Sequence, residues 1–202
     1  MTGWAHHTGT AVSLPRANID TDQLIPARFM SVPRGEGYGS YLMHDLRRDD
    51  GGKLNEDFPL NQAQNASILI AGANFGSGSS REAAVYALVD AGFRVVIAPS
   101  FGDIFASNAV NNGLLPAQVS IGDAETLAYV LSRTSNAIEI DLHDMSITVD
   151  DYTYFFELPE AWRTKLINGW DDIDLTLQHT DDIRRFRDAR QSTAPWAFPT
   201  VP

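Results

Sequence analysis

Cysteine is missing from this sequence of 202 residues. Without thiols the chain forms no disulfide, and it offers no thiolate nucleophile and no cysteine ligand to a zinc ion or an iron–sulfur cluster. The five histidines are spread along the chain apart from the adjacent pair His6 and His7, and they lack the spacing of a metal-ligand set. The sequence therefore predicts neither a metal site nor a cofactor held by this chain alone.

Basic residues and long apolar runs are also scarce. Lysine and arginine number 15 against 26 aspartates and glutamates, which gives a net charge of −11 at pH 7. A surface of this charge is unsuited to neutralising phosphates, so we expect no nucleic acid as a partner. No apolar run approaches the length of about 18 residues that a membrane span needs, and the N-terminus does not have the pattern of a secretory signal. We therefore expect a cytoplasmic protein that does not associate with a membrane.

The sequence does contain alternating strand-like and helix-like segments, with 44% hydrophobic residues available for a core. Short β-rich stretches predict strands at 67–71, 94–98 and 137–142, and a hairpin at 146–149 and 152–157. Helices are predicted from the serines at 79–80 to Gly92, from Ser100 as N-cap to about Asn112, at 123–133 and at 159–168. The length and the mixture of elements favour a single α/β domain spanning residues 1–202.

Two segments lack such patterns. Residues 31–58 have few apolar positions but several glycines and charges, which is typical of a long functional loop. We predict that this loop is mobile and closes over a site when partner and substrate are bound. The proline-rich tail at 193–202 carries Trp196 and Phe198, and we predict it to be irregular and exposed.

The stretch GANFGSGSSRE at 72–82 follows a predicted strand and opens a predicted helix. Its glycines allow the backbone to approach a ligand closely, and the free N–H groups of a helix N-terminus favour an anion. The stretch lacks the Gly-Lys-Ser/Thr of a nucleotide-binding P-loop, and its spacing is neither G-x-G-x-x-G nor G-x-S-x-G. It therefore indicates an anion-binding loop and argues against nucleotide hydrolysis and esterase chemistry.

Ser79 and Arg81 in this stretch each have a structural and a functional interpretation. Ser79 and Glu82 match the spacing of a capping box, which the spacing alone favours for Ser79. Arg81 is a cation in the first turn of a helix, where the helix dipole is unfavourable, so a carboxylate partner or an anionic ligand is expected. Asp22 lies in NIDTDQLIP at 18–26, a segment that on its own is typical of a local turn.

Six motifs are spread in order over nearly the whole chain: HTG at 7–9, NIDTDQLIP at 18–26, NFGSGSSRE at 74–82, VVIAPSFGDIF at 95–105, NNGLLP at 111–116 and LTLQH at 175–179. Together they resemble the small subunit of 3-isopropylmalate dehydratase, a family of the aconitase superfamily. The resemblance implies an α/β fold, namely the swivelling β/β/α domain that forms domain 4 of aconitase. It also implies a partner, a large subunit that carries a [4Fe–4S] cluster, which agrees with the lack of cysteine here.

The resemblance further implies a hydro-lyase that isomerises 2-isopropylmalate to 3-isopropylmalate in leucine biosynthesis. The partner's iron would act as a Lewis acid on the departing hydroxyl, while this chain removes a proton from the neighbouring carbon. By their positions in the motifs, Ser79 is the expected base and Asp22 is expected to orient it or an arginine. The residues expected to bind the dicarboxylate substrate are Ser80, Arg81 and Arg34, with Phe29, Met30 and Ser31 as the specificity stretch.

Some positions depart from the bacterial family pattern. Ser77 stands where that pattern has cysteine, Ala83 where it has histidine and Tyr86 where it has tryptophan. These changes keep two alternatives open: a small subunit for another alkylmalate, such as 2-methylmalate/citraconate or a dimethylmalate, or a non-catalytic anion-binding module of the same fold. Ser31 occupies the position at which homoaconitase-like relatives use an arginine for a third carboxylate, so an apolar substituent is the expected guest.

Overall fold

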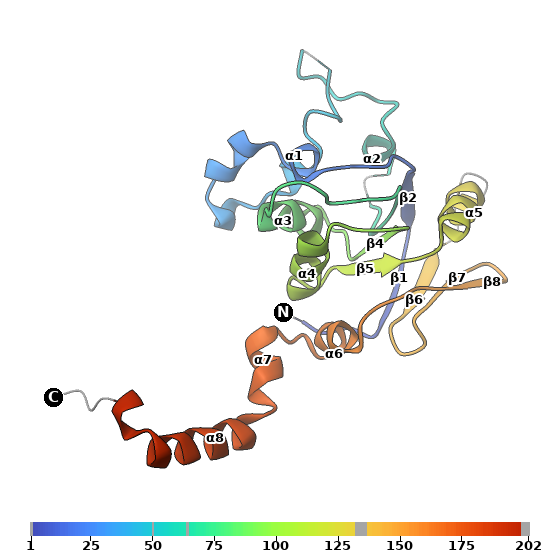
Figure 1. The fold of residues 1–202 in the computed structure, drawn as a ribbon. Coiled ribbons are helices and arrows are strands. Elements are labelled where there is room, and N and C mark those ends of the chain that lie inside the picture. Colours follow the sequence, from blue (N-terminus) through green and yellow to red (C-terminus); the bar gives the residue numbers. More distant parts are fainter. Residues whose placement is uncertain (1, 50, 64, 132–136, 199–202) are drawn as a thin grey trace.

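Two four-stranded sheets form the framework of the computed structural model, which describes residues 2–49, 51–63, 65–131 and 137–198 (Figure 1). The parallel sheet has the order β2 (Ala11–Leu14), β3 (Ile68–Ala71), β4 (Val95–Ala98) and β5 (Leu115–Gln118). The antiparallel sheet has the order β1 (His6–Gly9), β6 (Ile138–Asp141), β7 (Ser146–Val149) and β8 (Tyr152–Phe155). The predicted strands and the predicted hairpin are confirmed, whereas β1, β2 and β5 were not predicted.

Helices occupy most of the connections. The longer ones are α3 (Glu82–Asp90), α4 (Asp103–Asn111), α5 (Ile121–Leu131), α6 (Glu160–Asn168) and α8 (Thr180–Thr193). Short helices are α1 (Thr21–Leu24), α2 (Pro59–Gln62) and α7 (Asp172–Leu177). Single 3₁₀ turns are η1 (Ala27–Ser31), η2 (Arg34–Glu36), η3 (Gly39–Tyr41) and η4 (Pro195–Ala197).

The parallel sheet separates two hydrophobic clusters, because successive side chains of a strand point to opposite faces. Leu69 and Val96 face a cluster with α1, α3 and the segment 38–43. Ile68 and Ile97 face a second cluster, with α5, α6 and the antiparallel sheet. The layers are therefore antiparallel sheet, parallel sheet and helices (Figure 1), which confirms the β/β/α fold class.

Three predicted helix starts are wrong. Helix α3 begins at Glu82 with Arg81 at its N-cap and without a side-chain cap, so the capping box of Ser79 is not formed. Helix α4 has Gly102 as its N-cap, because the Ser100 hydroxyl instead accepts a hydrogen bond from the Asn74 N–H (2.8 Å). Helix α5 begins at Ile121, two residues before the predicted start.

The long segment 31–58 contains residues that belong to the core. Tyr38, Leu42 and Met43 are buried in the cluster against α3. The Tyr38 N–H donates to the Asp90 carboxylate (2.6 Å), and η3 packs close to the end of α3. The middle of this segment is therefore held by the chain's own core, and the mobility of the rest stays a prediction.

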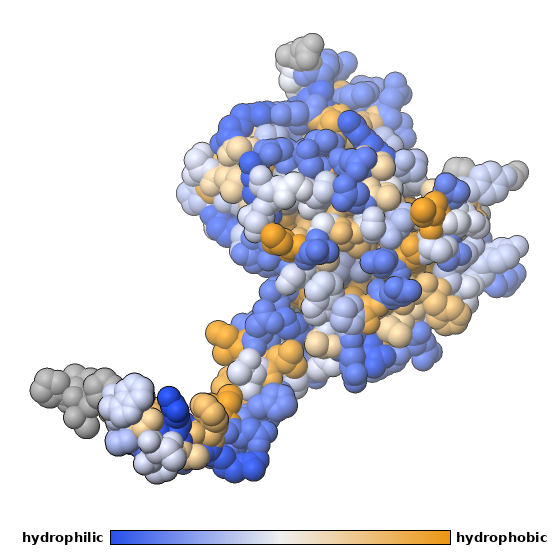
Figure 2. All heavy atoms as spheres, viewed as in Figure 1, coloured by the Kyte–Doolittle hydropathy of each residue, from blue (hydrophilic) through white to orange (hydrophobic). Residues whose placement is uncertain are grey.

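The C-terminal region differs most from the prediction. Helices α7 and α8 were not predicted, and α8 extends away from the body of the molecule (Figure 1). Orange patches lie along this arm in Figure 2. The large apolar side chains of the arm that are exposed are Ile173, Leu177, Ile183, Phe186 and Trp196. The tail is not wholly irregular, because Pro195–Ala197 forms the turn η4. Among the described residues, every helix is too short or too polar to cross a membrane.

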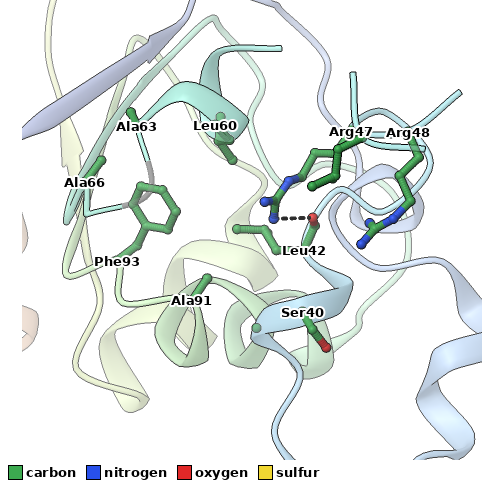
Figure 3. A pocket seen from close by; sticks show the side chains of 11 residues that line it. Ser40, Leu42, Arg47, Arg48, Leu60, Ala63, Ala66, Ala91 and Phe93 are labelled. Atoms are coloured by element: carbon green, nitrogen blue, oxygen red, sulfur yellow. Dashed lines mark hydrogen bonds between the residues drawn. The ribbon is translucent and has the colours of Figure 1, made fainter. Parts of the chain in front are cut away.

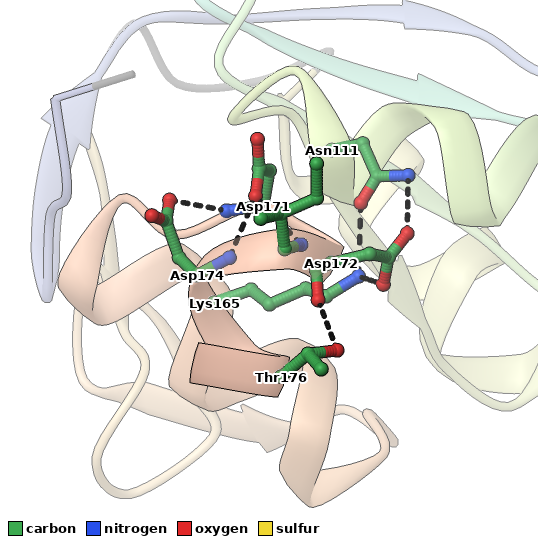
Figure 4. A network of polar contacts seen from close by, with 7 residues as sticks. Asn111, Lys165, Asp171, Asp172, Asp174 and Thr176 are labelled. Atoms are coloured by element: carbon green, nitrogen blue, oxygen red, sulfur yellow. Dashed lines mark hydrogen bonds and ion pairs between the residues drawn. The ribbon is translucent and has the colours of Figure 1, made fainter. Parts of the chain in front are cut away.

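A buried lysine holds this arm to the body (Figure 4). The Lys165 side chain on α6 is only 4% exposed, and its ammonium donates to Asn111 Oδ1 of α4 (2.9 Å) and pairs with Asp172 of α7. The ammonium holds the pKa of the Asp172 carboxyl below its usual range. Asp171 caps α7 by accepting from the N–H groups of Ile173 and Asp174 (2.8 and 2.9 Å). One buried charge and its partners thus set where the arm leaves the body.

Candidate functional site

Two loops meet beyond the carboxyl ends of the adjacent parallel strands β2 and β3, the edge at which α/β sheets commonly bind ligands. Backbone hydrogen bonds join the loops, among them Asn18 N–H to the Ala73 carbonyl (2.8 Å), Gly76 N–H to the Ile19 carbonyl (2.7 Å) and Thr21 N–H to the Ser77 carbonyl (2.9 Å). Both sequence-predicted motifs, 18–26 and 72–82, are therefore parts of one structure.

Glycine is required where the second loop turns. Gly76 has φ +71°, and a Cβ built on it would lie 2.2 Å from the Phe105 ring of α4. Gly102, at the start of α4, would place a Cβ 2.7 Å from the Gly76 carbonyl oxygen. The backbone of the loop consequently lies directly against the N-terminal end of α4.

An ion pair between Arg81 and Asp22 joins the two loops through their side chains. The Arg81 side chain is 20% exposed and the Asp22 side chain 56% exposed, so the guanidinium is the more enclosed partner. The contact uses Nη1 of the guanidinium. The expectation of a carboxylate partner for Arg81 is therefore confirmed, and the partner comes from the other motif.

Ser79 precedes Arg81 by two residues and is exposed. Its carbonyl accepts a hydrogen bond from the Thr21 hydroxyl (2.9 Å), which fixes the backbone of the serine against the first loop. Within the described part of the chain, no hydrogen bond restrains the Ser79 hydroxyl. Ser80 is exposed next to it. The structure thus brings together Ser79, Ser80, Arg81 and Asp22.

A hollow of about 200 Å³ opens at this point, lined by Thr21, Ser77, Ser79, Arg81 and the first residues of α4. The first N–H groups of α4 and the guanidinium both favour a negative charge in the hollow. An exposed hydroxyl lies at the same place, where it could accept a proton from a bound ligand. The arrangement suits a small anionic ligand and proton transfer to or from it.

Comparisons with known proteins cover most of the chain. A family model for the aconitase C-terminal domain matches residues 1–121, and a model for the C-terminal domain of the 3-isopropylmalate dehydratase small subunit matches residues 172–200. The 3-isopropylmalate dehydratase small subunit of Shouchella clausii is 47% identical over 188 residues, which are 92% of this chain and 95% of that protein. The chain belongs to the 3-isopropylmalate dehydratase small subunit family.

Further relatives agree with this family. The small subunit of the same name from Halalkalibacterium halodurans is 43% identical over 91% of this chain and 96% of its own length. A crystal structure of 3-isopropylmalate dehydratase from Methanocaldococcus jannaschii superimposes with a TM-score of 0.63 at 27% identity, over 90% of this chain and 99% of that one. The family resemblance seen in the motifs is confirmed, and so is a place in a hydro-lyase family of the aconitase superfamily.

Arg34, which the family resemblance implies as a substrate ligand, lies elsewhere. Its guanidinium donates to both oxygens of Asp90 (2.7 and 2.9 Å) and lies 4.3 Å from the centroid of the Tyr86 ring. Asp90 is the last residue of α3, and Arg81 is the N-cap of the same helix. At a rise of 1.5 Å per residue, the Arg81 end and the Asp90 end of α3 are about 13 Å apart. Burial and a hydrogen bond with Glu82 raise the pKa of Tyr86. In this arrangement Arg34 braces the far end of α3, and a substrate role for it stays a prediction.

The specificity stretch forms the turn η1, which follows α1. Phe29 stacks on Tyr41 with ring centroids 4.4 Å apart, Met30 is 40% exposed, and the Ser31 hydroxyl donates to the Arg28 carbonyl (3.2 Å). The neighbouring Asp45 carboxyl pairs with the Arg28 guanidinium, and this contact lowers the pKa of Asp45 to about 2. The aromatic stack and this ion pair hold η1 in place.

Residues outside the predicted set also belong to the hollow. Thr21 binds both the Ser77 and the Ser79 carbonyls, and Asp103 and Ile104 of α4 also line the hollow. Thr21 stands in the recognised motif, so its place in NIDTDQLIP was a usable signal. Asp103 and Ile104 were part of a predicted helix, and contacts between distant segments, such as the hydrogen bond from the Gly102 N–H to the Phe75 carbonyl (2.9 Å), bring that helix to the loop.

Proposed function

We propose that this chain is the proton-transferring small subunit of a two-subunit hydro-lyase that isomerises 2-isopropylmalate to 3-isopropylmalate in leucine biosynthesis. The observation that carries the proposal is the meeting of Ser79, Arg81 and Asp22 at one sheet edge. Relatives that carry the dehydratase name and align over more than nine-tenths of the chain support it.

In the proposed reaction the Ser79 side chain, as its alkoxide, takes the proton from the substrate carbon next to the one that loses its hydroxyl, and it becomes a neutral hydroxyl. The exposed, unrestrained hydroxyl suits this step, because it can turn toward the bound substrate. A serine is a weak base unless its alkoxide is stabilised, and the Arg81 guanidinium beside it is the available cation. In rehydration the same oxygen returns the proton to carbon.

Arg81 would also bind a substrate carboxylate. Its contact with Asp22 uses Nη1, so Nη2 and Nε remain as donors for a planar, two-point contact with a carboxylate. Asp22 fixes the direction of the guanidinium and is therefore a positioning residue. The neighbouring Ser80 hydroxyl is placed to donate a further hydrogen bond to the substrate.

The residues of this chain do not fit an iron–sulfur cluster, because the sequence has no cysteine. In the described part of the chain no three histidine, aspartate or glutamate side chains are grouped to hold a metal ion either. We propose that a [4Fe–4S] cluster resides in the large subunit, that departure of the hydroxyl depends on that subunit, and that this chain is active only with it. The assembled enzyme is proposed to work in the cytoplasm.

The substrate's third group is proposed to be apolar. Phe29 and Met30 present apolar surface on η1, and the Ser31 hydroxyl is already bonded to the backbone. No arginine is available at position 31 to pair a third carboxylate, and an unpaired buried carboxylate costs several kcal/mol or more. Tricarboxylates of the homocitrate type should therefore be poor substrates.

The test is to purify the chain with its large subunit under anaerobic conditions and to compare kcat/KM for isopropylmalate, citramalate and homocitrate. We expect isopropylmalate to be preferred, since each additional buried methylene contributes about 0.8 kcal/mol. A preference for citramalate would assign the chain to another alkylmalate, and a preference for homocitrate would contradict the apolar-group argument. Turnover by this chain alone would refute the two-subunit proposal. An assembled pair of wild-type subunits that turns over none of the three substrates would favour a non-catalytic module.

A further inference from the structure

A second cavity lies at the other edge of the parallel sheet, remote from Ser79 (Figure 3). Ala66 precedes β3 and Phe93 precedes β4, so the cavity is at the amino ends of these strands. Ala91 comes directly after α3, whereas Arg81 is at the start of that helix. The proposed reaction therefore makes no use of this cavity.

The cavity has an apolar wall and a cationic wall. Figure 3 shows the apolar side chains of Phe93, Ala63 and Ala66 on one side, with Arg47 and Arg48 opposite them. Its volume is about 330 Å³, which is within the range of sites for small molecules. Among the described residues that line it there is no carboxylate side chain. Within this part of the chain, the lining therefore offers the two guanidinium groups no counter-charge.

The two arginines are bonded to different degrees. Arg47 donates from Nε to Asn61 Oδ1 (2.7 Å) and from Nη1 to the Leu42 carbonyl (3.4 Å), so it is held by neutral groups. Arg48 Nη1 is buried, and within the described residues it has no hydrogen-bond partner. Burial and the neighbouring Arg48 charge lower the pKa of Arg47. A buried donor without a partner is costly, and an anion would satisfy it.

We propose that this cavity is a binding site for a small carboxylate with a short apolar tail. The carboxylate would accept hydrogen bonds from Arg48, next to the positive charge of Arg47. The tail would lie against Phe93 and the alanines, where it removes apolar surface from water. A free amino acid fits less well, because its ammonium group would face two guanidinium groups without a carboxylate in the lining.

The test uses the full-length chain and 4-methylpentanoate as the probe, with calorimetry and backbone-amide NMR as readouts. We expect saturable binding that shifts the amide signals of Ala91 and Phe93. The neutral 4-methylpentanamide should bind about tenfold more weakly or worse, and so should the probe to Arg48→Gln. Ala63→Leu, which fills the cavity from its apolar wall, should also abolish binding and covers the case in which Arg48→Gln does not fold. The matched control Arg81→Gln removes the guanidinium of the catalytic site and should leave probe binding unchanged.

Several results would overturn the proposal. They are the absence of binding, equal affinity for the amide, and binding that is lost in Arg81→Gln but kept in Arg48→Gln. If inorganic phosphate binds as tightly as the probe and competes with it, the site is a simple anion patch and the apolar tail has no role. None of these outcomes depends on isomerase activity, so the failure of this proposal and the failure of the proposed function are distinguishable.

Discussion

Replacing Ser79 by alanine separates the catalytic from the structural interpretation of this residue. A serine that caps a helix contributes about 1 kcal/mol to stability, which corresponds to about 2–4 °C in Tm for a chain of this size. The N-cap of α3 is Arg81, without a side-chain cap. We therefore expect Ser79→Ala to shift Tm by less than about 1 °C. If the hydroxyl is the base, kcat of the assembled enzyme should fall by about 10²–10⁴-fold.

Ser120 provides the matched control. Its hydroxyl accepts a hydrogen bond from the Asp123 N–H (3.1 Å) and donates to the Asp123 carboxylate (2.7 Å) at the start of α5. Ser120→Ala should therefore lower Tm by about 2–4 °C and leave kcat unchanged. Tm is measured on the isolated chain by circular dichroism, and kcat with the large subunit under anaerobic conditions. A loss of stability without a loss of turnover in Ser79→Ala would refute the assignment of the base.

Three other substitutions test the surroundings of the site. Asp22→Asn should raise KM for the dicarboxylate more than it lowers kcat, because it frees the Arg81 guanidinium. The free energy of unfolding should change by less than about 1 kcal/mol, since the ion pair is partly exposed. Equal KM values for the variant and the wild type would contradict the positioning role. Gly76→Ala should destabilise by about 2–4 kcal/mol in urea unfolding, because its Cβ would lie 2.2 Å from a phenylalanine ring at φ +71°, whereas Gly35→Ala has open space and should be neutral. Asp45 has its pKa lowered to about 2, so its contribution to stability is complete above the ordinary pKa of 3.8 and is lost as pH falls toward 2. The difference in the free energy of unfolding between wild type and Asp45→Asn should therefore shrink over that window. A difference that is independent of pH would argue against the ion pair.

The sequence predicts β3 and β4, the two middle strands of the parallel sheet, and the glycine-rich loop after β3, because these features depend on local patterns. The runs 68–71 and 95–98 are wholly buried and rich in β-branched residues, which is typical of central strands. The glycine-rich loop that follows the first of them indicates a close approach of the backbone to a ligand. The pairing of Arg81 with a carboxylate could be predicted from its unfavourable place at a helix start. Its partner, Asp22, could not be chosen by spacing alone, since the pair depends on β2 lying next to β3.

Other features depend on contacts between distant segments and escape local patterns. Residues 38–43 look like part of a polar loop, but Leu42 and Met43 are buried because η3 packs against the end of α3. The arm α7–α8 has a polar sequence whose start is fixed by the buried Lys165, a residue that composition rules would place at the surface. The cavity beside Arg47 and Arg48 likewise requires the fold, since its walls come from separate parts of the chain.

The bonds that join the two loops of the site also bear on how the chain folds. Asn18, Ile19 and Thr21 reach partners that lie more than fifty positions later in sequence. Contacts of such separation form late, because the intervening chain must first lose its conformational freedom. A partly folded chain in which β2 has not yet docked beside β3 therefore has no site at all. During refolding, competence to bind a substrate should return together with the slowest protection of the β2 amides from hydrogen exchange, and not before it.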